Sequence, residues 1–220
     1  MDIREAILAR RSIRQFLPKP VSEEMIRELL QDTLWSPSWG NTQPWEIVAA
    51  SGDALSRFRE ENVEALRSGK PMQPEIPLPS KWSEALKDRY NDVTKGVYDA
   101  LGIRRDDKEA RFQHLVRIFG LFDAPALVIM VLDESLALEY SMLDIGIFLQ
   151  TFCLLAHGKG LGTCILAASV LYAEIVRRHF QIPLEKRLVM GVVLGWPDLE
   201  APVNRFERRR GNLEEFVRWV

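Results

Sequence analysis

The sequence predicts a single α+β domain in which helices cover a sheet with buried central strands. Residues 126–132 and 188–194 are continuous apolar runs of strand length, which is typical of strands covered on both faces. Several other stretches place apolar residues at helical spacing. A chain of 220 residues, 47% of them hydrophobic, is long enough for one large domain with a proper core.

The first third of the chain predicts two helices and a strand. A short amphipathic helix covers residues 2–9, with Ile3 and Ile7 on its apolar face. Ser22 is a good N-cap for a second helix, since two glutamates follow it in the first turn. Residues 46–50 then predict a strand, and a helix follows from about residue 53 to residue 66.

The middle of the chain predicts an excursion over residues 68–110. Residues 68–80 contain four prolines and predict irregular structure. Residues 81–101 predict a helix, and the charged run 104–109 predicts a solvated turn and a helix start. Residues 73–103 are the natural candidate for a lid over an active site.

Two apolar elements indicate a partner. Residues 138–159 predict a long helix that is apolar nearly all round, and one domain of this size can hardly cover it on every side. This favours a homodimer, and the alternative is a central core helix in a monomer. The C-terminal arm, residues 196–220, ends in an apolar tail from Leu213 onward, which we expect to dock on another surface.

Composition argues against several classes of protein. With 29 basic and 31 acidic residues, the net charge of −2 gives no sign of a nucleic-acid binder. The two cysteines and three scattered histidines form no disulfide framework and no zinc motif. The start of the chain lacks the apolar core of a signal peptide, and the run 145–156 is too short to span a membrane. We therefore expect a cytoplasmic protein.

Two segments carry the candidate chemistry. Arg10, Arg11, Ser12 and Arg14 offer three planar guanidinium groups and a hydroxyl, which suit phosphate oxygens. The alternative is a helix end with cations against its dipole. Residues 36–45 combine two prolines, a glycine, two amides and two tryptophans, which suits a planar heteroaromatic ring with polar edges.

Together these motifs resemble a known family. Arg10-Arg11-Ser12-x-Arg14-x-Phe16, followed about twenty residues later by Ser36-Pro37-Ser38-x-x-Asn41-x-Gln43-Pro44-Trp45, is similar to the opening of the FMN-dependent nitroreductases, and most similar to their nitrobenzoate-reductase branch. The resemblance covers nearly the whole chain as one domain, residues 1–220. It implies a three-layer α-β-α sandwich, with a central mixed or antiparallel sheet flanked by helices and a C-terminal arm exchanged in a homodimer.

The resemblance also assigns residues to FMN. It implies that Arg10, Arg11 and Ser12 hold the phosphate and ribityl end, with Arg208 and Arg210 closing on the phosphate; without it, residues 208–210 read as a solvated surface run. Arg14 takes the place beside N1 and the C2 carbonyl, where a fixed cation raises the flavin potential. Arg117 is either a second donor to that ring edge or a helix-surface residue.

The remaining ring contacts come from two loops. In the family, the loop matching residues 160–168 lies along the flavin, and a backbone N–H near Leu166 or Ala167 meets N5. Many relatives carry a proline or glutamate there, whereas Cys164 and Leu166 stand at the matching positions here. Cys164 is either a redox nucleophile or a buried small thiol. The ring contacts assigned by the resemblance are Cys164, Ile165, Leu166 and Ala167, and, from the other protomer, Pro37, Ser38 and Trp39 with Asn41 and Gln43 nearby.

The function implied is reduction of nitroaromatic or quinone acceptors by NADH or NADPH, in ping-pong fashion through flavin N5, with no catalytic side chain. A dinucleotide-binding glycine fingerprint is missing, so the sequence does not decide between the two nicotinamides. One alternative is a specialised enzyme on the same scaffold, for reductive dehalogenation or flavin breakdown. Another is a non-catalytic flavin-binding or nucleotide-sensing protein.

Overall fold

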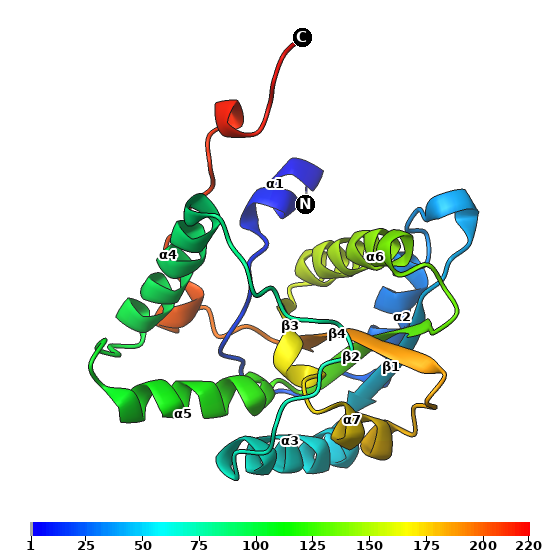
Figure 1. The fold of residues 1–220 in the computed structure, drawn as a ribbon, viewed down its shortest axis with the longest axis horizontal. Coiled ribbons are helices and arrows are strands. Elements are labelled where there is room, and N and C mark those ends of the chain that lie inside the picture. The colour runs from blue at the N-terminus through cyan, green and yellow to red at the C-terminus, as the bar shows by residue number, and fades with distance from the viewer. Residues whose placement is uncertain (1) are drawn as a thin grey trace.

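A four-stranded antiparallel sheet forms the centre of the protein in a computed structural model that describes residues 2–220 (Figure 1). Its strand order is β1-β2-β4-β3, so the two apolar runs found in the sequence occupy the middle. The strands are β1 (Glu46–Ser51), β2 (Ala126–Asp133), β3 (Gly162–Leu166) and β4 (Lys186–Gly195).

Helices make up most of the remaining regular structure. The second helix begins as predicted, since Oγ of Ser22 accepts from the Met25 N–H at 3.2 Å. The helix predicted from residue 81 begins three residues later, after Ser83 in an extended conformation. The helices are α1 (Ile3–Ala9), α2 (Glu23–Thr33), α3 (Gly52–Arg67), α4 (Glu84–Ala100), α5 (Lys108–Phe119), α6 (Leu138–Gly158) and α7 (Ala173–Phe180).

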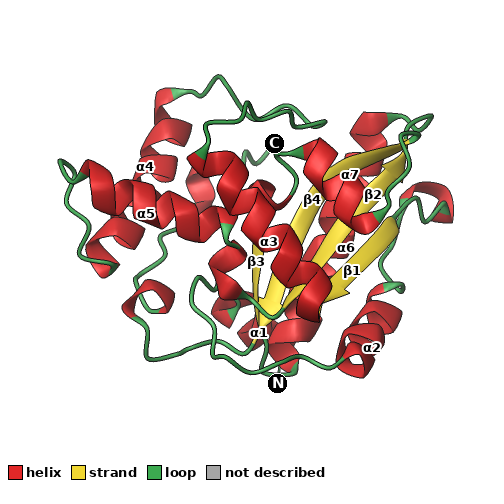
Figure 2. Cartoon of the chain, turned by 90° about the horizontal axis from the view of Figure 1, so that it is seen from below, coloured by secondary structure: helices red, strands yellow, loops and turns green. Residues whose placement is uncertain are grey.

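The alternation of side chains along β2 creates two cores. Val128 and Met130 pack with α2 and α6 on one face of the sheet. Leu127 and Ile129 pack on the other face with apolar side chains of α3, α5 and α7. The result is a three-layer α-β-α arrangement, with the sheet between α6 and the pair α3 and α7 (Figure 1), which confirms the predicted α+β sandwich. Seen from below, α3 and α7 lie in front of the sheet (Figure 2).

One stretch predicted as a loop is a strand. Residues 162–166 pair with β4 as the edge strand β3, and a single 3-10 turn, Ala167–Ser169, follows. The glycines and the threonine in this stretch obscure the strand pattern, but antiparallel pairing with β4 supplies the backbone hydrogen bonds. Helix α7, which no sequence pattern indicated, comes next in the chain.

The excursion is anchored at both ends. The Gln73 N–H donates to the Leu171 carbonyl at 2.8 Å, and Glu75 forms an ion pair with Arg177 at 2.7 Å. At the far end, Val97 of α4 is buried against Ala201 and Val203. Most of α4 is exposed between these points, and the C-terminal end of the chain extends beyond it, away from the sheet (Figure 1).

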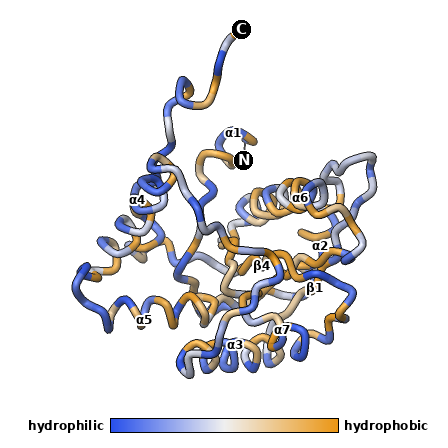
Figure 3. Tube along the Cα trace, in the orientation of Figure 1, coloured by the Kyte–Doolittle hydropathy of each residue, from blue (hydrophilic) through white to orange (hydrophobic). Residues whose placement is uncertain are grey.

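An apolar surface runs along α6 and α1. Leu143 of α6 is 64% exposed, and Ile3 and Leu8 of α1 are 72% and 60% exposed. Apolar segments of the two helices lie side by side there (Figure 3). By length and composition, α6 is the one helix within residues 2–220 that could cross a membrane, a test that core helices also pass.

Candidate functional site

The segment that follows α1 lies along the outer edge of β3. Ser12 forms a parallel bridge with Thr163, and the Ile13 N–H donates to the Thr163 carbonyl at 2.9 Å. Gly162 permits this approach, since a Cβ there would lie 2.5 Å from Cγ1 of Ile13. Ordered backbone at the sheet edge therefore carries the arginine motif.

Arginines from the two ends of the chain meet at this edge. Arg208 donates to the carbonyl oxygen of Leu8 at 2.7 Å and to that of Arg10. Arg11 donates to the carbonyl oxygen of Phe206. Arg210 is exposed, and its guanidinium donates to the carbonyl of its neighbour at 2.8 Å. We name the half-buried set the arginine cradle: Arg10, Arg11, Ser12, Arg14 and Arg208.

The cradle is electropositive and incompletely satisfied. Burial lowers the pKa of Arg208, and repulsion from Arg11, Arg210 and Arg10 lowers it further. Burial lowers the pKa of Arg11 as well, with a smaller contribution from Arg14. Nε of Arg10 is buried without a hydrogen-bond partner among residues 2–220. Cations gathered at this density are stabilised by an anion, and a phosphate group fits the donors present.

The side chain of Arg14 extends from a clamped backbone. Its N–H donates to Oδ1 of Asn204 at 2.8 Å, and its Nη1 contacts the Ser12 carbonyl at 3.3 Å. Its guanidinium lies 5.7 Å from the centroid of the Phe206 ring. The C-terminal segment therefore contacts Arg14 twice: Asn204 binds its backbone, and the Phe206 ring lies near its guanidinium.

Strand β3 presents few side chains to this region. Cys164 is 5% exposed, and burial raises the pKa of its thiol, which favours the buried-thiol alternative over a redox nucleophile. Leu166 is buried, Ala167 is half-buried and Ile165 is exposed. Contacts here with a flat ligand would come from the backbone and from Ile165.

The loop with Pro37 and Ser38 lies at the N-terminal end of α6. The Trp39 N–H donates to the Asp144 carboxylate at 3.0 Å, and its ring packs against Tyr140 at 5.9 Å. Internal hydrogen bonds fold the loop: Oγ of Ser38 accepts from the Gln43 N–H at 2.9 Å, and the Gln43 side chain donates to the Asn41 carbonyl at 3.3 Å. Trp39 is 67% exposed, so its ring faces outward.

Within one chain this loop does not meet the cradle. His157, near the C-terminal end of α6, lies close enough to Arg10 and Arg208 for both to lower its pKa, after the larger effect of burial. Tyr140 and His157 are 17 residues apart on α6, which corresponds to about 25 Å along a helix. The loop and the cradle therefore lie at opposite ends of α6 in one chain.

Arg117 lines a different surface. It lies in the last turn of α5 beside a cavity of about 350 Å³ between α3 and α5, which Arg59 and Arg67 also line. Its neighbour His114 is 9% exposed, and its pKa is lowered first by burial and then by Arg117 and Arg14.

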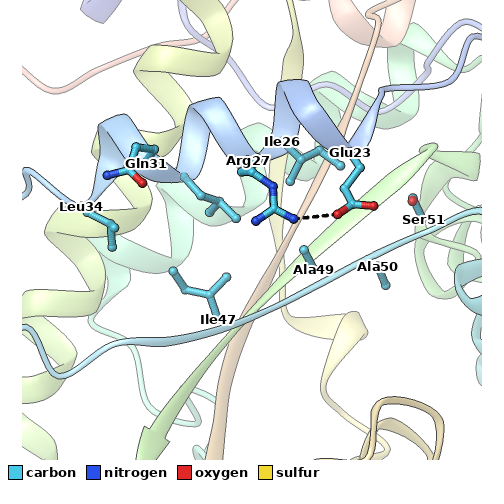
Figure 4. A pocket seen from close by; sticks show the side chains of 10 residues that line it. Glu23, Ile26, Arg27, Gln31, Leu34, Ile47, Ala49, Ala50 and Ser51 are labelled. Atoms are coloured by element: carbon cyan, nitrogen blue, oxygen red, sulfur yellow. Dashed lines mark hydrogen bonds and ion pairs between the residues drawn. The ribbon is translucent and has the colours of Figure 1, made fainter.

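A second cavity, of about 400 Å³, lies between α2 and the outer edge of β1 (Figure 4). Ile47 and Ala49 of β1 face Leu34 and the exposed Glu23–Arg27 ion pair across it. β1 pairs only with β2 in the sheet, so its other edge has backbone groups available. No residue of the cradle lines this groove.

Sequence reasoning missed two residues of the site. Asn204, which is 2% exposed, holds the backbone of Arg14, and Phe206 contacts both Arg11 and Arg14. Both lie in an irregular segment without helix or strand periodicity, so only their tertiary contacts identify them. In residues 2–220, no group of three His, Cys, Asp or Glu side chains is placed to hold a metal ion.

Comparisons with known proteins converge on one family. A family model described as the nitroreductase family matches residues 7–196. The chain is 36% identical to the nitrobenzene nitroreductase of Ectopseudomonas oleovorans, over 99% of this chain and 96% of that protein. It is 28% identical to the 4-nitrobenzoate reductase of Pseudomonas putida, over 100% of this chain and 96% of that protein. Its structure is similar to that of the FMN-dependent nitroreductase NfnB from Mycobacterium smegmatis in complex with NADPH, with a TM-score of 0.93, 28% identity, and coverage of 99% and 97% of the two chains.

Proposed function

This chain belongs to the nitroreductase family, and we propose that it binds FMN and uses NADPH or NADH to reduce nitroaromatic compounds. The observation that carries the proposal is the meeting of Arg208 with Arg10 and Arg11 at the edge of β3. We extend it to quinone-type acceptors and to ping-pong order, in which the nicotinamide leaves before the acceptor enters.

The cradle fits the phosphate end of FMN. The buried Nε of Arg10 has no partner within residues 2–220, and the mutual repulsion of Arg11 and Arg208 is relieved by a phosphate dianion. The Ser12 hydroxyl lies in the same segment and can donate to a phosphate or ribityl oxygen. These residues bind and orient and take no part in proton or covalent chemistry.

Arg14 supplies positive charge near the flavin ring. When bound, FMN provides hydride transfer at N5, and the protein tunes that chemistry by placing charge near the ring. The fixed cation of Arg14 stabilises negative charge at the pyrimidine edge, and Asn204 and Phe206 keep it from swinging into solvent. The backbone of residues 165–167 and the exposed side chain of Ile165 lie beside the cradle and exclude water from one side.

The working form in this proposal is a homodimer. The exposed apolar surface of α1 and α6 gives a second copy a continuous face to cover, including Ile7 and Leu143. The loop around Trp39 and the cradle lie at opposite ends of α6, so one ring can contact both only where two chains meet. The exposed tail, with Phe216 and Trp219, offers further apolar surface for the second copy to cover.

Two other functions fit the same cradle. A specialised reaction on this scaffold, such as reductive dehalogenation or flavin breakdown, would keep the cradle and change the groups that face the acceptor. A flavin-binding protein without turnover would keep it too. The 36% identity with a nitrobenzene nitroreductase along nearly the whole chain favours nitroreduction over both.

The test is direct. The purified protein should carry the absorbance bands of bound flavin, and anaerobic addition of NADPH or NADH should bleach them. A panel of nitroaromatic and quinone acceptors should then restore the bands, with parallel double-reciprocal plots for ping-pong order. A protein that binds no flavin contradicts the proposal, and one that holds flavin but is not reduced by either nicotinamide is a binder and not an enzyme.

A further inference from the structure

The ring of Phe206 lies against two arginines of the cradle. Its centroid is 6.0 Å from the guanidinium carbon of Arg11 and 5.7 Å from that of Arg14. Its carbonyl oxygen also accepts a hydrogen bond from Arg11. An aromatic face attracts a cation at this distance, so one half-buried residue fixes the direction of two guanidinium groups.

Helix α4 holds the same ring from another side. A Cβ at Gly96 would lie 2.8 Å from Cδ2 of Phe206 and 3.1 Å from its Cε2. A glycine inside a helix is unfavourable compared with alanine, and this close approach of the ring explains its presence. Val97, the next residue, is buried with Ala201 and Val203, so the contact is part of a small core.

Further contacts join α4 to the segment that carries Arg208. Arg89 pairs with Glu215 at 2.5 Å and lies 4.8 Å from the Phe216 ring, and Asp92 faces Arg209 at 3.8 Å. Helix α4 therefore contacts the C-terminal segment from Arg89 to Val97.

We propose that Phe206 is a positioning residue for Arg11 and Arg14, and that α4 sets its position through Gly96. The inference rests on the proposed function, because its consequence is the affinity for FMN and the potential of the bound flavin. A ring pushed toward the cradle displaces both guanidinium groups, which weakens the hold on the phosphate and moves positive charge away from the ring edge.

The test uses the purified full chain, with Gly96→Ala and Phe206→Leu as variants and the exposed neighbour Asn91→Ala as the matched control. Three quantities are measured: the dissociation constant for FMN by titration of the apoprotein, the midpoint potential of the bound flavin, and the melting temperature. Gly96→Ala should raise the dissociation constant about three- to tenfold, within the range of a cation–π contact, and should lower the potential. Asn91→Ala should match the wild type, and Phe206→Tyr, which keeps the aromatic face, should stay near it.

A double variant, Gly96→Ala with Phe206→Leu, tests whether Gly96 acts on the cradle through the Phe206 ring. If Gly96 acts through the ring, Gly96→Ala should add little to the change in FMN affinity already caused by Phe206→Leu. Unchanged affinity and potential in both single variants, with only the melting temperature lowered, would show a purely structural contact and overturn the proposal while leaving FMN binding intact. Additive effects in the double variant would overturn the route through Phe206. A wild-type protein that binds no FMN overturns the proposed function itself.

Discussion

The backbone N–H of Arg14 donates to the side-chain oxygen of Asn204 at 2.8 Å, although the two residues are 190 positions apart. The amide of Asn204 also donates to the carbonyl oxygens of Gln15 and Asp198, each at 2.8 Å. A buried amide that makes three hydrogen bonds is costly to replace, because removing it leaves backbone groups unsatisfied. The start of the Arg14 side chain is thus fixed by the far end of the chain.

Arg14→Ala should lower the midpoint potential of the bound flavin, because the positive charge near the ring edge is lost. The measurement is spectroelectrochemical titration of the loaded protein. Arg14→Lys keeps a charge without the planar fork and should give an intermediate potential. An unchanged potential in Arg14→Ala would refute the role assigned to this residue.

Arg208→Ala should weaken FMN binding about ten- to a hundredfold, since a charge-assisted contact to phosphate is worth roughly 1.5–3 kcal/mol. Riboflavin lacks the phosphate, and its affinity should change little. Titration of the apoprotein with both ligands provides the comparison. Arg209→Ala is the control, because Arg209 is 76% exposed and faces only Asp92, at 3.8 Å. Equal losses in the two variants would indicate a general charge effect and not a phosphate site.

Glu75→Gln should lower the free energy of unfolding by about 2–4 kcal/mol, because a largely buried charge at Arg177 loses its partner. Glu75 also accepts from the Leu188 N–H at 2.7 Å, next to the register shift between β2 and β4. Chemical denaturation measures the change. Glu23→Gln breaks the exposed pair with Arg27 and should cost about 0.3–0.5 kcal/mol. A similar small loss at Glu75 would show that the anchor of the excursion contributes little to stability.

Removal of residues 213–220 should weaken the proposed homodimer, because the tail keeps large apolar side chains such as Trp219 mostly exposed within its own chain. Sedimentation velocity over a range of concentrations, together with the melting temperature, measures the effect. A milder variant, Trp219→Ala, should move the dimer dissociation constant in the same direction. A truncated chain that is fully dimeric and equally stable would contradict the docking of the tail.

Asp133 should contribute to stability only above strongly acidic pH. Its hydrogen bonds to Ser135 and Lys186 lower its pKa from 3.8 to about 2. A carboxyl group whose pKa is lower in the folded state stabilises the fold above its unfolded pKa, and this contribution disappears as the pH falls from about 4 to about 2. Asp133→Asn should therefore melt below the wild type at pH 6, and the difference should close near pH 2. A difference independent of pH would contradict this assignment.

The sequence predicts the layers and, with the family resemblance, names all five residues of the cradle, whereas the residues that hold the cradle emerge only from tertiary contacts. The buried strands β2 and β4 and the Ser22 cap of α2 follow from local patterns. Residues 162–166 were predicted as a loop because glycine and threonine hide a strand that depends on pairing with β4. The roles of Asn204 and Phe206 were not predictable, because an amide and an aromatic ring in an irregular segment have no periodicity to interpret.

The contact of Arg208 with the carbonyls of Leu8 and Arg10 has a consequence for biosynthesis. The ribosome makes Arg10 and Arg11 long before it makes Arg208. The anion site therefore stays incomplete until residue 208 has been translated. A phosphorylated ligand can meet the complete set of cradle arginines only after residue 208 has been made and folded against Arg10. A chain that stopped between Gly195 and Arg208 would keep all four strands of its sheet but would lack Arg208 and bind the ligand more weakly.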